Sequence, residues 1–101
     1  MVIIAQKIIN EFATLYPLSA YSLNRWNKTV LMSDWSNFNE VKEAFSSTDF
    51  VGNDRYVFNL GGNKYRLVAM IHFSKRTLYI RFIGTHAQYD EICKKGILNT
   101  I

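Results

Sequence analysis

The chain has 101 residues, a length that fits a single domain. Hydrophobic residues make up 49% and charged residues 20%, a globular composition that is too apolar for a disordered protein. Twelve Lys and Arg against eight Asp and Glu give a formal net charge of +4, which suits a polyanionic partner without proving one. The single cysteine excludes an internal disulfide, and the short apolar N-terminus argues against a signal peptide or membrane span. We therefore expect one cytoplasmic domain over residues 1–101, with no membrane contact.

The N-terminal part of the chain has helical periodicity. Apolar residues recur three or four positions apart over residues 4–16 and predict an amphipathic helix that ends at Pro17. Ser19 can cap a second helix. The apolar positions of this second helix are Leu23, Trp26 and Val30, which we expect to face the core.

A third, shorter helix is predicted from its capping pattern. Asn37 is followed three residues later by Glu40, which resembles a capping box with Asn in the place of Ser or Thr. The helix would bury Val41, Ala44 and Phe45. The tryptophans at positions 26 and 35 are interpreted as packing residues and not as platforms for stacking bases.

Beyond residue 54 the hydrophobic period changes to two, which indicates strands. Residues 55–60 alternate, and residues 61–64 supply turn chemistry before Tyr65, so the two segments should form a hairpin. Residues 67–71 are an unbroken apolar run, as expected for a central strand covered on both faces. A third strand over residues 77–83 completes an antiparallel β-meander.

The end of the chain predicts one more helix. Thr85 and Gln88 fit a T-x-x-Q capping box, and the helix should extend to about Cys93, which we expect to be a small buried hydrophobe. The predicted fold is α+β, with N-terminal helices packed on a three-stranded antiparallel β-meander and a short C-terminal helix. An alternative adds a short N-terminal strand.

The meander should bring three separated segments together at one end of the sheet. Arg66 on the middle strand would lie beside the start of the last helix, where His86 is, and Asn59 would lie opposite on the first strand. Unpaired N–H groups at a helix start favour a phosphate, and Tyr89 shares a helical face with His86. An arginine, a histidine and a tyrosine at an anion site suit phosphoryl transfer on RNA, which needs a base, an acid and positive charge.

Each of these residues also has a structural interpretation. An isolated histidine such as His86 is more often a hydrogen-bonded structural residue, and Tyr89 could belong to the core. Arg66 could pair with an acidic residue or cover the sheet edge with its aliphatic stem. The face that Arg81 occupies stays open because the strand register is not fixed. One Cys and two separated His have no metal-ligand spacing, so we expect no metal and no cofactor.

Two long motifs resemble the HigB toxin family within the RelE-like group. They are V-F-N-x-G-G-N-x-x-R-L-V at residues 57–68 and I-R-x-x-x-T-H-x-x-Y-D at residues 80–90. The resemblance implies a RelE-like fold and the toxin of a type II toxin-antitoxin system. This toxin would be a metal-independent endoribonuclease that cleaves mRNA, commonly on the ribosome, and so inhibits translation and growth. Its partner would be a helix-turn-helix antitoxin of the HigA type, through which operator DNA is contacted only indirectly.

The resemblance also implies roles for single residues. Arg66 matches the RelE arginine at the scissile phosphate, His86 takes the acid/base role and Tyr89 the role of the nearby tyrosine. RelE has a lysine pair where this chain has Tyr56 and Phe58, so RNA-binding groups are expected elsewhere: Arg55, Asn59, Asn63, Lys64 and Arg81. The alternative is a non-catalytic binding module of the same fold, such as a gyrase-type poison or an RNA-binding subunit, because a fold does not fix a function.

Overall fold

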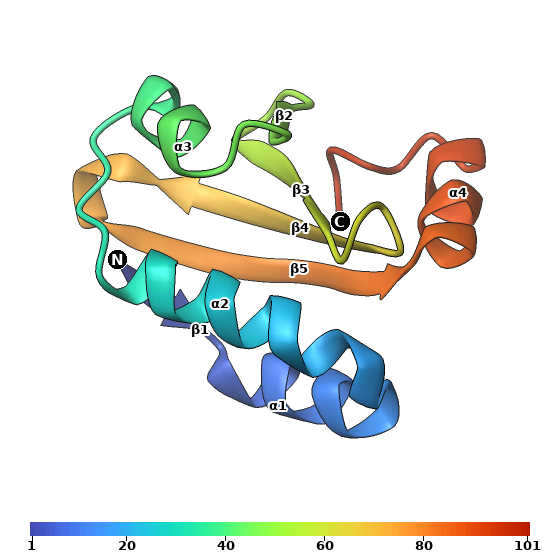
Figure 1. Cartoon of the computed structure of the whole chain (residues 1–101). Helices are drawn as coiled ribbons and strands as arrows, with labels where there is room; N and C mark the ends of the chain where they lie inside the picture. Colours follow the sequence, from blue (N-terminus) through green and yellow to red (C-terminus); the bar gives the residue numbers. More distant parts are fainter.

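A computed structural model describes all 101 residues as a five-stranded sheet with four α-helices (Figure 1). Two short 3₁₀ turns, Pro17–Ser19 and Phe73–Lys75, join neighbouring elements. No helix combines the length and hydrophobicity that crossing a membrane requires. In chain order the elements are β1 (Val2–Ile4), α1 (Gln6–Leu15), α2 (Ala20–Leu31), α3 (Phe38–Ala44), β2 (Asp49–Phe50), β3 (Arg55–Leu60), β4 (Tyr65–His72), β5 (Thr77–Thr85) and α4 (His86–Lys94).

The predicted meander is present, and two more strands extend it. The strand order is β1-β5-β4-β3-β2, with antiparallel pairing from β2 through β5. β1 runs parallel to β5, with Val2 opposite Thr77, so the alternative with an N-terminal strand is confirmed. The expected count of three strands was too low, because strands of two or three residues are too short to show a period.

The first helix is shorter than the sequence pattern indicated. It begins at Gln6 because the residues before it pair with β5, and it ends before Pro17 as predicted. Ile9 and Phe12 are buried, whereas Leu15 is 75% exposed. Ser19 does not cap α2 with its side chain; its hydroxyl donates instead to the carbonyl oxygen of Tyr16 at 2.6 Å.

The other predicted helix features are largely confirmed. Leu23, Trp26 and Val30 are buried, and so is Trp35. At α3, the Asn37 side chain accepts the Glu40 N–H at 3.1 Å, but the Glu40 carboxylate binds the backbone N–H of Ser36, so only half of the capping box forms. Val41 is buried there and Phe45 is half-buried, but Ala44 is exposed, so its predicted burial was wrong.

Both faces of β4 are covered, as the apolar run predicted. Alternate residues from Tyr65 to Ile71 belong to the main core under the N-terminal helices. Val68 points to the opposite face and is also fully buried. α4 contacts β4 and β5 at one end of this second face. No residue of α4 is fully buried, and Cys93 is exposed. The expectation of a buried cysteine was therefore wrong.

Candidate active site

The backbone brings together the three segments that the sequence placed at one end of the sheet. Arg66 pairs with Asn59 on β3 and with Gly84 on β5. The N–H of His86 donates to the carbonyl oxygen of Lys64 at 3.0 Å, which ties the start of α4 to the hairpin turn. A Cβ at Gly84 would lie 2.4 Å from the Phe82 ring and 2.7 Å from the Gln88 Oε1, so both side chains would have to shift. The end of β5 is therefore closely packed against the first turn of α4.

Arg66 is a nearly buried cation without a counterion. The residue is 9% exposed, and its guanidinium donates to the carbonyl oxygens of Asn63 at 3.0 Å and Tyr65 at 3.2 Å. The guanidinium carbon lies 5.6 Å from the centre of the Tyr89 ring, within the range of a cation–π contact. No carboxylate forms an ion pair with it. Its charge is thus held in place but not neutralised, which suits an anionic ligand.

His86 begins α4 and is paired with an acidic residue one turn later. Thr85 and Gln88 form the complete capping box that the sequence predicted. The His86 Nδ1 lies 2.9 Å from Asp90 Oδ2, and both side chains are about half exposed. A carboxylate accepts hydrogen bonds, so in the neutral ring Nδ1 carries the hydrogen and Nε2 is the basic nitrogen. The helix start thereby holds an oriented base.

The ring of Tyr89, on α4, lies against the guanidinium of Arg66. Burial, followed by the neighbouring Cys93 side chain, raises the pKa of Tyr89 to about 12, although the charge of Arg66 acts in the opposite direction. The Asp49 carboxylate also raises this pKa. The Tyr89 hydroxyl therefore stays protonated at neutral pH and can donate a hydrogen bond.

Three of the residues predicted to bind RNA lie at this end of the sheet. Asn59 lies opposite Arg66, but its amide is engaged, since its Nδ2 donates to the carbonyl oxygen of Ser47 at 2.8 Å. Asn63 and Lys64 are exposed in the hairpin turn, where Asn63 has a φ of 74°. Lys64 forms no ion pair, and its carbonyl oxygen accepts the hydrogen bond from the His86 N–H described above.

The other two predicted RNA-binding residues lie elsewhere. Arg55 pairs with Met70 at the far end of β3, and its Nε and Nη2 donate to the carbonyl oxygen of Ile101 at 3.2 and 2.8 Å. Arg81 is exposed at a bulge in β5, where the register skips it. Tyr56 and Phe58 belong to the hydrophobic core. Six of the predicted site residues thus lie at the end of the sheet beside α4: Arg66, His86, Tyr89, Asn59, Asn63 and Lys64. Arg55 and Arg81 lie outside this group.

Sequence reasoning gave no role to two acidic residues of the site. Asp90 could have been found, because its spacing of four residues from His86 places both on one face of a helix. Asp49, whose charge acts on Tyr89, gave no such signal, because β2 is 40 residues away along the chain. No group of three or more His, Cys, Asp or Glu side chains is arranged to hold a metal ion.

Comparison with known proteins gives consistent matches. A sequence model of the HigB toxin family, described as the RelE-like toxic component of a toxin-antitoxin system, matches residues 19–92. The mRNA interferase toxin HigB of Escherichia coli K12 is 37% identical over 92 residues, covering 89% of this chain and 88% of the relative. The mRNA interferase HigB of Escherichia coli O6:H1 is 31% identical over 96 residues, or 93% of each chain. The chain therefore belongs to the HigB toxin family, whose members are paired with an antitoxin.

Proposed function

We propose that this chain is an endoribonuclease that cleaves mRNA and so inhibits translation and growth. Arg66 carries the proposal, because it is a nearly buried cation without a carboxylate partner, placed over the Tyr89 ring and opposite Gly84, two residues before α4 begins. The relatives named mRNA interferases support it. A phosphate of RNA would supply the anion that this arrangement lacks.

The proposed reaction is an attack of a ribose 2′-oxygen on the adjacent phosphorus. A bond forms from the 2′-oxygen to phosphorus, and the bond from phosphorus to the 5′-oxygen breaks. Nε2 of neutral His86 accepts the proton of the 2′-hydroxyl. Asp90, hydrogen-bonded to Nδ1, then stabilises the imidazolium that forms. Arg66 stabilises the charge that develops on the phosphate oxygens.

The leaving 5′-oxygen must receive a proton. Tyr89, whose pKa is raised to about 12, is protonated at neutral pH and gives its proton to this oxygen. Asn59, Asn63 and Lys64 would contact the RNA on either side of the cut. Arg81, exposed on β5, would contact RNA farther from the cut, and the same role for Arg55 requires it to give up its hydrogen bonds to Ile101.

The setting of this reaction is also part of the proposal. We place the toxin in the cytoplasm, acting on mRNA bound to the ribosome. Its antitoxin would be a HigA-type helix-turn-helix protein, and operator DNA would be contacted through that antitoxin alone. Helix-turn-helix proteins carry their own DNA-reading helix, so the toxin needs none.

The test is to express the chain in cells and to map new RNA 5′ ends in a translated reporter mRNA and in the same mRNA with its translation blocked. Cuts that appear in translated mRNA and disappear when translation is blocked are the expected result. The Arg66→Ala variant, expressed to the same level, should give no new ends. Growth inhibition without any new ends would contradict the proposal and favour a non-catalytic module such as a gyrase-type poison.

A further inference from the structure

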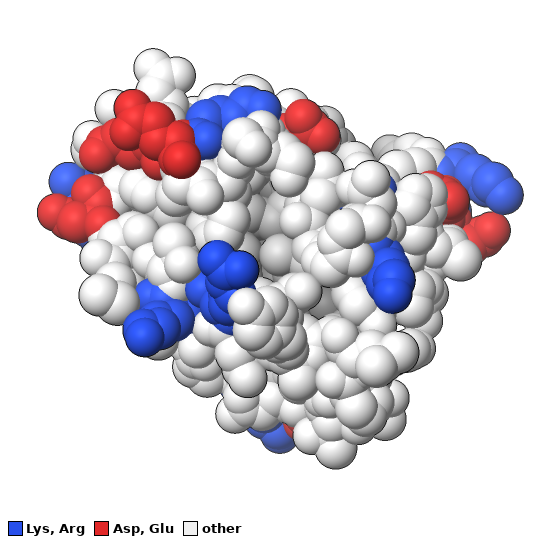
Figure 2. Space-filling model, in the orientation of Figure 1, with Lys and Arg blue, Asp and Glu red and all other residues white.

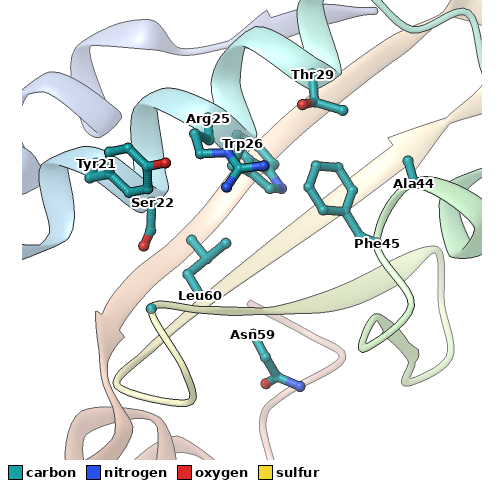
Figure 3. A pocket seen from close by; sticks show the side chains of 10 residues that line it. Tyr21, Ser22, Arg25, Trp26, Thr29, Ala44, Phe45, Asn59 and Leu60 are labelled. Carbon is teal, nitrogen blue, oxygen red and sulfur yellow. The ribbon is translucent and has the colours of Figure 1, made fainter.

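A pocket of about 290 Å³ opens on the helix-covered side of the sheet, between α2, the end of α3 and the end of β3 (Figure 3). Its walls include Trp26 and Arg25 of α2, Phe45 after α3, and Leu60 of β3. These walls belong to the opposite side of the sheet from Arg66, since Trp26, Phe45 and Leu60 pack in the main core. Asn59, which pairs with Arg66, also lines the β3 edge of the pocket, so the pocket adjoins the candidate active site at that one residue.

The pocket contains an unused hydrogen-bond donor. Trp26 is 1% exposed, and its indole Nε1 is buried without a hydrogen-bond partner. Figure 3 shows this nitrogen on the side of the ring that is turned toward Phe45. Buried polar groups in proteins are almost always satisfied, so this N–H is a site for an acceptor that a ligand brings.

The charge of the pocket is positive and unpaired. Arg25 forms no ion pair, and its guanidinium carbon lies 5.7 Å from the centre of the Tyr21 ring. No Asp or Glu lines the pocket. Figure 2 shows basic side chains over α2 on this face, whereas acidic side chains lie over α3 and near α4. An acceptor with a negative charge matches the donors of Arg25 and Trp26.

The surroundings favour a protein ligand over RNA. Leu15, Leu18 and Tyr21 follow one another across the connection from α1 to α2 and are 75%, 84% and 71% exposed. Exposed apolar side chains grouped in this way mark protein contacts. A nucleic acid backbone is held by several cations, whereas Arg25 is the one charged residue that lines the pocket.

We propose that the antitoxin inserts a Glu or Asp side chain into this pocket. Its carboxylate binds the guanidinium of Arg25 and the indole N–H of Trp26, and its methylene groups pack on Phe45 and Leu60. The exposed side chains of Tyr21 and Arg25 can move aside to admit it. Arg, Trp and Tyr are the residues that most often dominate binding energy at interfaces. The inference rests on membership in a toxin-antitoxin family and not on the nuclease chemistry.

The test compares two charge reversals on α2, Arg25→Glu and Lys28→Glu. Lys28 is exposed on the same helix but does not line the pocket, which makes it the matched control. Purified toxin is titrated with the antitoxin produced from its own operon, and the Kd is measured by calorimetry. Arg25→Glu should weaken binding by about 30-fold or more, because it breaks a buried charge pair. Lys28→Glu should change the Kd by about threefold or less, as expected for a charge at the rim.

A second readout follows the indole itself. In ¹⁵N-labelled toxin, the Trp26 indole N–H signal should move when the antitoxin is added, while that of Trp35, which is outside the pocket, serves as the internal reference. An unchanged Kd for Arg25→Glu together with an unmoved Trp26 signal would overturn the proposal. Loss of toxicity of folded Arg25→Glu in the absence of antitoxin would overturn it too and assign the pocket to RNA or the ribosome. Neither readout depends on cleavage, so failure of the proposed nuclease function would be seen separately.

Discussion

The two faces of strand β4 carry side chains of different chemical character. Leu67 faces the N-terminal helices and is fully buried in the main core. Arg66, the residue before it, faces the other way and is almost as buried, yet it is charged and has no ion-pair partner. One strand thus presents a packing residue and a candidate catalytic residue side by side.

This difference indicates that one face of β4 contributes to stability and the other to the proposed chemistry. Burying a leucine side chain contributes about 1.5–3 kcal/mol. Burying a cation costs free energy unless polar groups compensate, and here two carbonyl oxygens and the Tyr89 ring do so. Under the proposed function, the role of Arg66 is chemical and not stabilising. Substitutions on the two faces should therefore have opposite consequences for stability and for activity.

The largest change in stability is expected from Leu67→Ala. Removal of this fully buried side chain should lower the free energy of unfolding by about 2–5 kcal/mol, because it leaves a cavity in the core. Urea denaturation measures it. RNA cleavage per folded molecule should be close to that of the parent. A decrease of less than about 1 kcal/mol in the free energy of unfolding would mean that neighbouring core side chains move in and fill the cavity.

Arg66→Ala should have the complementary effect. The variant should lose a factor of about 100 to 1,000 in cleavage, since it removes a donor aimed at the transition-state charge. Single-turnover cleavage on programmed ribosomes measures the loss, and thermal melting verifies that the variant is folded. Near-full activity in a folded variant would place the phosphate elsewhere and remove the contrast between the two faces.

His86→Gln tests proton transfer at the same end of the sheet. Glutamine keeps some hydrogen bonding but cannot titrate near neutral pH, so the variant should lose at least about 100-fold in cleavage rate. The same single-turnover assay is used, with ribosome binding measured in parallel. A loss under about tenfold with intact binding would return His86 to a structural role.

Asp90→Asn should be milder than His86→Gln. Because the His86–Asp90 pair is half exposed, it contributes about 1 kcal/mol, and its loss should slow cleavage by about fivefold. A cleavage rate equal to that of the parent would show that Asp90 does not act on the histidine.

The smallest effect concerns alkaline pH. Because the pKa of Tyr89 is raised from 10 to about 12 in the folded chain, the unfolded state loses this proton first as the pH rises. The free energy of unfolding should then decrease between pH 10 and pH 12, and Tyr89→Phe should reduce that decrease. Urea titrations at pH 9 and pH 11 on both proteins measure the difference. Equal decreases in the two proteins would contradict the assigned shift.

The sequence by itself determined the features that depend on local patterns. The alternation of residues 55–60 and the glycine-rich turn after it predicted the hairpin, and Thr85 with Gln88 predicted the start of α4. Hairpin connections fix register, so the approach of Arg66 to the start of α4 followed without any structure.

Only the tertiary structure decided the contacts between distant segments. Pairing of β1 with β5, the hydrogen bonds from Arg55 to Ile101 and the position of Asp49 near Tyr89 join residues at least 40 positions apart. The pocket beside Trp26 forms in the same way, from two helices and a strand end. No local period encodes such contacts, because they depend on how whole elements pack after each has formed.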